Sequence, residues 1–358
     1  MQHETQHFQL KVAGAVCFYI VAALVMVFVN KAVLNKTPDL PFTFLFIQLA
    51  IAVLLLRLLA LLSHSPLHHI LPAQFELPKL DRIIAKKLFP FLSVGFIGLI
   101  FNTLCLANVD ASFFQIARGL LLPFTILVAS LCARTVPRAY VLLAAAIVTG
   151  GFLVGIAPSL YPGSTAEAAR EPLKALVYGF VSCLVLSVHA VLSKAATAHV
   201  THSVVALSYW GNLMMSLMMV PCVVLNGEIA AYHRRFLSPD EDWTTFVVGS
   251  AVTGLFGCLL GIANAWSIKL TSPITHMFSS AARSVIQTVL GVLIFGDIMT
   301  TYRLGGIGLI TCGTIFYTWA QSQSHAKPAG MTPVPTTDVE KQTEKSEETS
   351  DSDFDEEF

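Results

Sequence analysis

Apolar residues gather along the chain into ten stretches that short polar connections separate. An α-helix needs roughly 20 apolar residues to cross the hydrocarbon core of a membrane, and each stretch is close to that length. The stretches cover about 11–34, 42–62, 87–108, 112–133, 138–158, 174–196, 203–225, 244–267, 274–296 and 301–321. No cleavage site of small residues follows the first stretch, so we interpret it as a span rather than a signal peptide. The pattern predicts an all-α polytopic membrane protein with ten transmembrane helices.

Composition supports this interpretation. Hydrophobic residues make up 55% of the 358 residues and charged residues 12%, against roughly 25% charged residues in a soluble domain. These values exclude an ordinary soluble protein and a disordered one. The seven cysteines are scattered, most of them within apolar stretches, and form no CxxC pair. We therefore expect no disulfide framework, no metal site and no cofactor.

The charges between the spans predict how the chain crosses the membrane. Ten spans place both termini on one side, and Lys and Arg are more frequent in the connections on that side. Because cytosolic loops carry the excess of Lys and Arg, we expect both termini to be cytosolic. We divide the chain into a cytosolic N-terminus (1–10), a membrane bundle (11–321) and an acidic cytosolic tail (322–358) that we expect to be disordered.

The two halves of the bundle, about 11–160 and 172–321, carry related features. Arg118 in the first half and Arg283 in the second each follow an alanine, and an apolar stretch, a polar break and a glycine-containing span come after each. Because five spans per half is an odd number, equivalent helices run in opposite directions. This predicts a 5+5 inverted repeat, an architecture typical of transporters, with a site near the membrane midplane between the halves.

Both arginines lie deep within predicted spans. At a rise of about 1.5 Å per residue, Arg118 lies about 12 Å along its helix from Asp110, and Arg283 about 16 Å from Ser272. The two helices enter from opposite faces, so both arginines lie near the middle of a core about 30 Å thick. Inserting an arginine there costs at least about 2.5–3.5 kcal/mol. No Asp or Glu lies inside a predicted span, so we expect an anion from outside the protein to balance the two charges.

The missing carboxylates also separate the function classes. Proton- or sodium-coupled carriers usually keep an intramembrane acid, and a membrane-embedded enzyme needs a positioned base or a metal. The sequence therefore favours a carrier of an anion, because paired arginines suit bidentate contacts with phosphate. The alternative from another class is a non-transporting membrane scaffold or receptor. An enzyme is not expected.

Further polar residues of the spans are candidates for substrate binding beside the two arginines. They are Asn30, Lys31, Asn102, Gln115, Tyr209, Asn212, His276, Ser279, Ser280 and Gln287. Gln115 shares a helix face with Arg118, because the two are three residues apart. Tyr209 and Asn212 can hydrogen-bond a base or a sugar, or can join helices. Lys31 can instead reach the membrane surface, and His276 can be structural.

The same residues resemble a known family. The resemblance covers about 11–321 and is densest at 101–106 (Phe-Asn-Thr-Leu-Cys-Leu) and 271–276 (Thr-Ser-Pro-Ile-Thr-His), with Arg118 and Arg283 in the spans that follow. These stretches are similar to those of the nucleotide-sugar transporters of the drug/metabolite transporter superfamily, in the branch that includes the plastid triose-phosphate translocators. Within that branch they most resemble the GDP-fucose transporters.

The resemblance implies an antiporter of the Golgi membrane, or of the endoplasmic reticulum. Such an antiporter moves a GDP-sugar into the lumen in exchange for GMP, and it works by alternating access. The sugar nucleotide that the resemblance favours is GDP-fucose. Arg283 then stands where the family has a lysine in a motif that binds sugar and phosphate. Ser208-Tyr209-Trp210-Gly211-Asn212 stands where the family has a base-binding Phe-Tyr-Asn-Asn motif.

Because that second motif is changed, the base and the sugar stay open. The alternatives are another nucleotide-sugar, such as a UDP-sugar or GDP-mannose, and small phosphorylated metabolites. The partners implied are a nucleotide-sugar, a nucleoside monophosphate and membrane lipids. A homodimer is left open, and no nucleic acid is expected.

Overall fold

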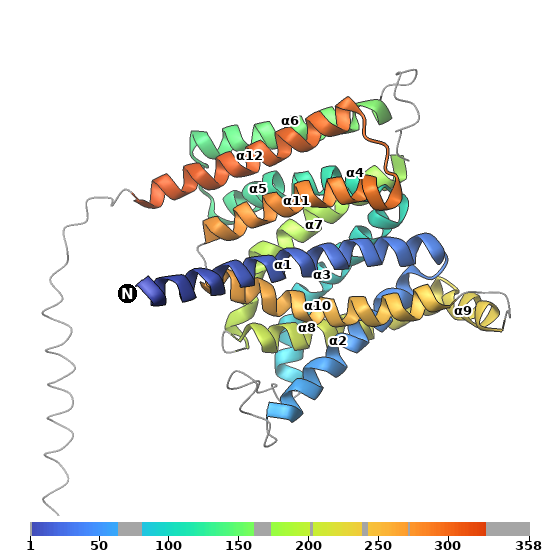
Figure 1. Ribbon diagram of the computed structural model, residues 1–358. Coiled ribbons are helices and arrows are strands. Elements are labelled where there is room, and N and C mark those ends of the chain that lie inside the picture. Colours follow the sequence, from blue (N-terminus) through green and yellow to red (C-terminus); the bar gives the residue numbers. More distant parts are fainter. Residues whose placement is uncertain are drawn as a thin grey trace, which may run out of the picture. The chain divides into compact units, whose positions relative to one another are not determined.

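The computed structural model describes residues 2–63, 81–160, 173–200, 203–237, 243–270 and 273–326. These residues form helices and no strand, in the order α1 (Gln2–Lys36), α2 (Pro41–Ser63), α3 (Arg82–Asn108), α4 (Ala111–Ala117), the 3-10 turn η2 (Arg118–Leu120), α5 (Leu121–Ala133), α6 (Ala139–Leu160), α7 (Leu173–Ala198), α8 (Val204–Leu225), α9 (Glu228–Phe236), α10 (Thr244–Leu270), α11 (Pro273–Phe295) and α12 (Thr301–Ala326). Residues 1–319 form one compact unit. Within it the long helices run side by side (Figure 1), with α3 along α7 and α1 along α10.

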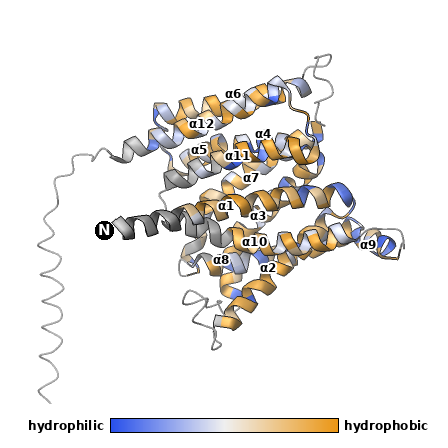
Figure 2. Cartoon of the chain, viewed as in Figure 1, coloured by the Kyte–Doolittle hydropathy of each residue, from blue (hydrophilic) through white to orange (hydrophobic). Residues whose placement is uncertain are grey.

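Most of the long helices are apolar enough to cross a membrane. Seven described segments have the length and hydropathy of a span: Ala13–Lys36, Pro41–Leu62, Arg82–Asn108, Ala111–Ala133, Ala139–Pro158, Leu173–Ser193 and Val205–Leu225. Two shorter apolar segments, Thr244–Leu260 and Ala281–Phe295, lie in α10 and α11. Figure 2 shows hydrophobic residues along the helices and hydrophilic ones at α9 and at helix ends. The predicted all-helical membrane class is confirmed, while the count of ten spans and their repeat stay predictions.

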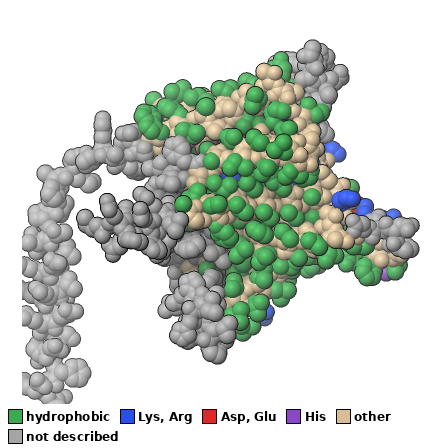
Figure 3. Space-filling view, viewed as in Figure 1, with side chains coloured by type: hydrophobic (Ala, Val, Ile, Leu, Met, Phe, Trp, Pro, Cys, Tyr) green, Lys and Arg blue, Asp and Glu red, His purple; other side chains and the backbone are tan. Residues whose placement is uncertain are grey.

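The outer surface of the bundle is apolar. Large hydrophobic side chains such as Leu54, Leu61 and Leu293 are exposed, and hydrophobic side chains cover much of the face shown in Figure 3. A soluble monomer rarely exposes so continuous an apolar surface. Facing lipid, the same side chains need no further partner.

The span from Ala111 to Ala133 is interrupted at Arg118. Here the helix tightens into the turn η2, in which the Leu121 N–H bonds to the Arg118 carbonyl. The cause is Pro123, which lacks an N–H and whose ring crowds the carbonyl of Gly119, four residues before it. A short 3-10 stretch within a long helix often marks a functional hinge. Arg118 therefore sits at the one break in its span.

Polar contacts join the two predicted halves at the end of the bundle opposite the N-terminus of α1 (Figure 1). Arg303 of α12 is buried, pairs with Asp110 before α4 at 2.7 Å and lies 5.1 Å from the Phe113 ring. Beside it, the Ser112 N–H donates to Asp297 Oδ2 at 2.7 Å. We call Asp110, Ser112, Asp297 and Arg303 the Arg303 cluster.

A second set of contacts lies at the same end. Glu228 is buried at the start of α9, a short helix that the pattern of apolar stretches does not predict. Its carboxylate accepts hydrogen bonds from the backbone N–H groups of Phe42 (3.1 Å) and Thr43 (2.6 Å) and from Asn226 Nδ2 at 3.0 Å. The carboxylate therefore caps the N-terminus of α2, where a negative charge is favourable. We call Phe42, Thr43, Asn226 and Glu228 the Glu228 cluster.

Candidate binding site

Two cavities lie inside the bundle, and both are lined by Tyr19, Arg118 and Arg283. The first has a volume of about 280 Å³ and contains the side chains of Asn30 and Gln48; we call it the amide cavity. The second has a volume of about 230 Å³ and is lined by Ser284, Thr311 and Thr314; we call it the hydroxyl cavity. The arginines therefore mark the junction of the two spaces.

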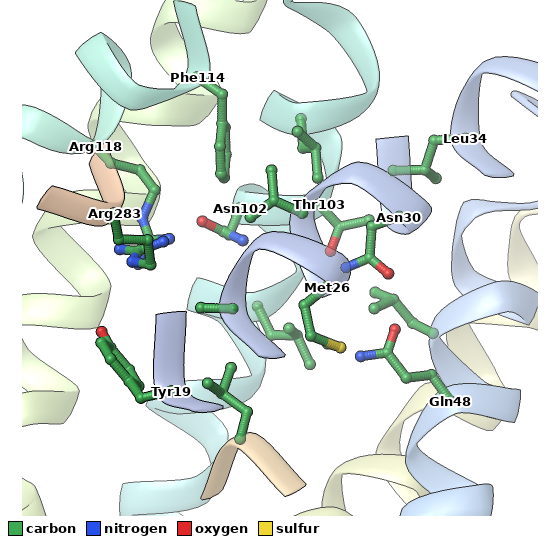
Figure 4. Close-up of a pocket in the computed structure, with 16 residues that line it drawn as sticks. Tyr19, Met26, Asn30, Leu34, Gln48, Asn102, Thr103, Phe114, Arg118 and Arg283 are labelled. Carbon is green, nitrogen blue, oxygen red and sulfur yellow. The ribbon is translucent and has the colours of Figure 1, made fainter. Parts of the chain in front are cut away.

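The structure brings Arg118 and Arg283 together, from η2 and from α11. Their guanidinium groups lie next to each other in Figure 4, close enough for the two charges to repel. Arg118 also stacks over the Phe114 ring at 5.6 Å, and Arg283 Nε is buried without a hydrogen-bond partner. In the part of the chain that the structure describes, neither guanidinium forms an ion pair with a carboxylate. An anion placed between them would relieve the repulsion and use the free donors.

The amide cavity extends away from the arginines between α1, α2 and α3. Asn102 and Thr103 lie along it, and Asn30 and Gln48 lie toward its other end, with Met26 between them (Figure 4). The side-chain oxygens of Asn30 and Gln48 are buried and have no hydrogen-bond partner. A buried polar group without a partner costs about 1–3 kcal/mol. A ligand with donors at this end would remove that cost.

The hydroxyl cavity lies on the other side of the arginines. Its polar lining comes from Gln115 of α4, Ser284 of α11, and Thr311 and Thr314 of α12. The side-chain oxygens of Gln115, Ser284 and Thr311 are buried without a partner, whereas Thr314 donates to the Ile310 carbonyl at 2.8 Å. Gly119 also lines this cavity, and a Cβ added to it would lie 2.7 Å from Ile310 Cδ1. The arrangement suits a ligand that carries several hydroxyl groups.

Of the residues predicted from the sequence, five line these cavities: Asn30, Asn102, Gln115, Arg118 and Arg283. Others are buried outside them. Lys31 donates to the Leu106 carbonyl at 3.0 Å, and Gln287 donates to the Ala111 carbonyl at 3.1 Å. Ser279 is buried but is not part of either lining. The side chains of His276 and Ser280 lie outside what the structure describes.

The pair Tyr209 and Asn212 also lies away from both cavities. The Tyr209 hydroxyl accepts a hydrogen bond from Arg57 Nε at 2.9 Å, and its ring packs against Leu56 of α2. Asn212 donates to the Ser208 carbonyl of its own helix at 2.8 Å. In this structure both residues therefore make structural contacts.

The structure adds lining residues that the sequence reasoning missed, namely Tyr19, Gln48, Thr103, Ser284, Thr311 and Thr314. Gln48 carried a usable signal, because it is a lone amide within an apolar span. The threonines carried none, since a threonine in a membrane helix commonly bonds to a carbonyl of its own helix.

The comparisons of the sequence with known proteins indicate one family. The family described as "Triose-phosphate Transporter family" matches residues 10–318. The chain is 30% identical to "GDP-fucose transporter 1" of Mus musculus over 319 residues, which cover 87% of this chain and 84% of that one. It is 26% identical to "GDP-fucose transporter, Golgi" of Drosophila melanogaster over 298 residues, with 81% and 83% covered.

One solved structure, titled "Crystal structure of protein", aligns with a TM-score of 0.50 and 14% identity. The alignment covers 88% of this chain and 98% of that one. At this identity the likeness concerns the fold alone.

Proposed function

The chain belongs to the Triose-phosphate Transporter family, and from this premise we propose that it exchanges cytosolic GDP-fucose for luminal GMP across the Golgi membrane. Relatives named as GDP-fucose transporters match most of the chain, which confirms the resemblance seen in its sequence. The Golgi location rests on the same relatives, one of which carries that compartment in its name.

The observation that carries the proposal is the arginine pair at the junction of two cavities. A nucleotide-sugar has its negative charge on a diphosphate in the middle of the molecule, with an uncharged group on either side. The site has the matching layout, with Arg118 and Arg283 at its centre and a cavity on either side. Guanidinium groups bind phosphate oxygens through two parallel hydrogen bonds each.

Ten membrane-spanning helices in two inverted halves, with both termini cytosolic, complete the proposal. The apolar segments of α10 and α11 and the 26 residues of α12 support three spans beyond the seven recognised by length and hydropathy. In this orientation the Arg303 and Glu228 clusters close the luminal end. The proposed boundaries stay at 1–10, 11–321 and 322–358, although most of the tail lies outside the described residues.

Exchange follows from the charge at the site. Two arginines without a buried counter-ion disfavour closing of the empty bundle around them, whereas a bound anion balances both charges. The bundle then switches sides readily only when it is loaded, because the anion binds the closed intermediate better than the open forms. Net release without a returning nucleotide is slow for the same reason.

Transport in liposomes tests this function. Purified protein is reconstituted into liposomes that contain GMP or only buffer, and uptake of labelled GDP-fucose is measured. GMP-loaded liposomes are expected to take up substrate well above the buffer-filled ones. Arg283→Ala is expected to abolish the difference, whereas Arg234→Ala, which removes an exposed arginine of α9, keeps it. Equal uptake into both kinds of liposome would exclude obligatory exchange.

The rival functions give different results in the same assay. A carrier of small phosphorylated metabolites is inhibited by triose phosphate but not by GMP, and it leaves the amides of Asn30 and Gln48 without a ligand. A carrier of another nucleotide-sugar is inhibited by UMP rather than GMP. A scaffold or receptor shows no uptake. Replacing either Arg118 or Arg283 by Ala then causes no loss of ligand-dependent stability.

A further inference from the structure

The two cavities differ in chemistry, and that difference gives the substrate a direction within the site. The inference rests on the proposed function, because it assumes a ligand with a base on one side of a diphosphate and a sugar on the other. With the diphosphate held at Arg118 and Arg283, one cavity receives the base and the other the sugar.

The amide cavity suits a base. Its walls include Met26, Leu45 and Phe114, apolar side chains against which a planar ring can pack. Toward the end away from the arginines lie the amide groups of Asn30 and Gln48, whose oxygens Oδ1 and Oε1 are buried and have no partner. Two acceptors require two donors on one edge of the ligand.

Among the common bases, guanine meets that requirement. Its N1–H and its N2 amino group are adjacent donors on one edge. Uracil offers one ring N–H between two carbonyls, and cytosine and adenine each offer one amino group next to an acceptor nitrogen. On that edge each of these bases therefore presents a single N–H, which pairs with only one of the two oxygens.

The hydroxyl cavity suits a sugar. Its free oxygens belong to Gln115, Ser284 and Thr311, which come from α4, α11 and α12. Side-chain hydroxyl groups both donate and accept, so they match the hydroxyl groups of a sugar in more than one arrangement. Gly119 and Ala281 also line this cavity.

We propose that Asn30 and Gln48 recognise the N1–H and N2 amino edge of guanine, and that the hydroxyl cavity, with Thr311, holds the sugar. Base selectivity then comes from α1 and α2. The Ser-Tyr-Trp-Gly-Asn stretch of α8 supports this site through the Tyr209–Arg57 hydrogen bond but does not contact the base.

Inosine monophosphate gives a test at the level of single atoms, because it is GMP without the N2 amino group. The full-length protein, purified in detergent, is titrated with GMP and with inosine monophosphate. The unmodified protein is expected to bind GMP about tenfold more tightly, the effect of about one net hydrogen bond. At least one of the variants Gln48→Met and Asn30→Leu is expected to reduce the ratio of the two affinities, GMP to inosine monophosphate, to near one. The affinity of each variant for inorganic pyrophosphate, which contacts only the arginines, is expected to equal that of the unmodified protein. An unchanged affinity shows that the variant is folded.

Matched variants separate this assignment from its competitors. Asn108→Leu removes an amide that bonds within α3, outside both cavities, and should leave the ratio unchanged. Thr311→Val should weaken GDP-fucose binding several-fold relative to GMP. Loss of the ratio in Asn212→Leu, with the ratio retained in both Gln48→Met and Asn30→Leu, would overturn the assignment in favour of α8.

The outcomes also distinguish the assignment from the function. If the unmodified protein binds no guanine nucleotide at all, the proposed function fails. If it binds GMP and exchanges it for GDP-fucose while both amide variants keep the ratio, the function stands and the base assignment fails. Should Gln48→Met not fold, Asn30→Leu decides the question alone.

Discussion

Arg283 and Arg303 are both buried and both lie in the second half of the chain, but their surroundings differ. Arg303 has Asp110 at 2.7 Å and the Ile298 carbonyl at 2.9 Å. Arg283 faces the like charge of Arg118 and forms no ion pair with a carboxylate among the described residues. The charge of the first arginine is balanced within the protein, whereas under the proposed function the charge of the second is balanced by the ligand.

We expect opposite effects from the same substitution at these two positions. Arg303→Met should lower the free energy of unfolding by about 2 kcal/mol, less than a fully buried pair loses because the Asp110 side chain is 40% exposed. Arg283→Met should not lower it, and should raise it by about 1 kcal/mol, since an unpaired buried charge is replaced by an apolar side chain. Unfolding in detergent without nucleotide measures both. A loss of stability in Arg283→Met as large as in Arg303→Met would contradict the difference between the two sites.

At the scale of helices, α6 and α12 touch through their backbones. A Cβ atom added to Gly151 would lie 2.8 Å from the carbonyl oxygen of Gly306, and one added to Gly306 would lie 2.7 Å from that of Gly151. Both are backbone atoms, which cannot move aside as a side chain can. Because α12 carries Thr311 and Thr314, this contact also fixes one wall of the hydroxyl cavity.

The neighbouring glycines of α6 provide a controlled test. Gly151→Ala should destabilise the protein by about 1–3 kcal/mol, because the helices must separate, and it should weaken GDP-fucose binding more than GMP binding. At Gly150 an added Cβ meets nothing within 4 Å, so Gly150→Ala should be neutral or stabilising by up to about 1 kcal/mol. Thermal unfolding and ligand titration of both variants check this; equal behaviour of the two alanines would refute the close contact.

At the scale of the whole molecule, the Arg303 cluster, which joins the two predicted halves, contains a carboxylate whose burial disfavours its charged form. Burial raises the pKa of the Asp297 carboxyl, and the charge of Asp110 adds to this, while the Ser112 N–H and Arg303 act against it. The folded protein therefore binds this proton more tightly than the unfolded chain does. As a result, the free energy of unfolding rises as the pH falls from the raised pKa to the ordinary pKa of about 3.9.

Asp297→Asn should remove this dependence on pH. The variant is expected to be at least as stable as the unmodified protein near neutral pH, and to lose that advantage as the pH is lowered. The measurement is the difference in unfolding midpoint between the two proteins as a function of pH. A difference that stays constant would mean that the Asp297 carboxyl keeps an ordinary pKa.

The sequence predicted the large features of this architecture for physical reasons. An apolar stretch long enough to cross the hydrocarbon core is typical of a membrane helix, so the all-helical class and the span from Ala111 to Ala133 could be predicted. Two arginines within apolar stretches are costly anywhere but at a site, and the structure brings Arg118 and Arg283 to one junction.

The neutral residues were harder to predict. An amide or hydroxyl in a membrane helix can bond to its own backbone, as Asn212 does, or face a cavity, as Gln48 does. Sequence spacing does not tell which face of a helix points inward when lipid and protein are equally apolar. Tyr209 and Gln287 were therefore predicted as ligands, and in the structure their contacts join helices. Thr311, which lines the hydroxyl cavity, was not among the candidates.

The separation of the two cavities has a consequence for the energetics of the proposed cycle. The delivered GDP-fucose and the returned GMP share the base and one phosphate. They differ in the second phosphate, which the arginines hold, and in the sugar, which the hydroxyl cavity receives. A carrier that responds to charge at its centre switches equally well with either cargo, so the protein itself imposes no direction. The compartments set it instead: where the sugar is transferred and the remaining GDP is hydrolysed to GMP and phosphate, GMP accumulates and leaves in exchange for more GDP-fucose.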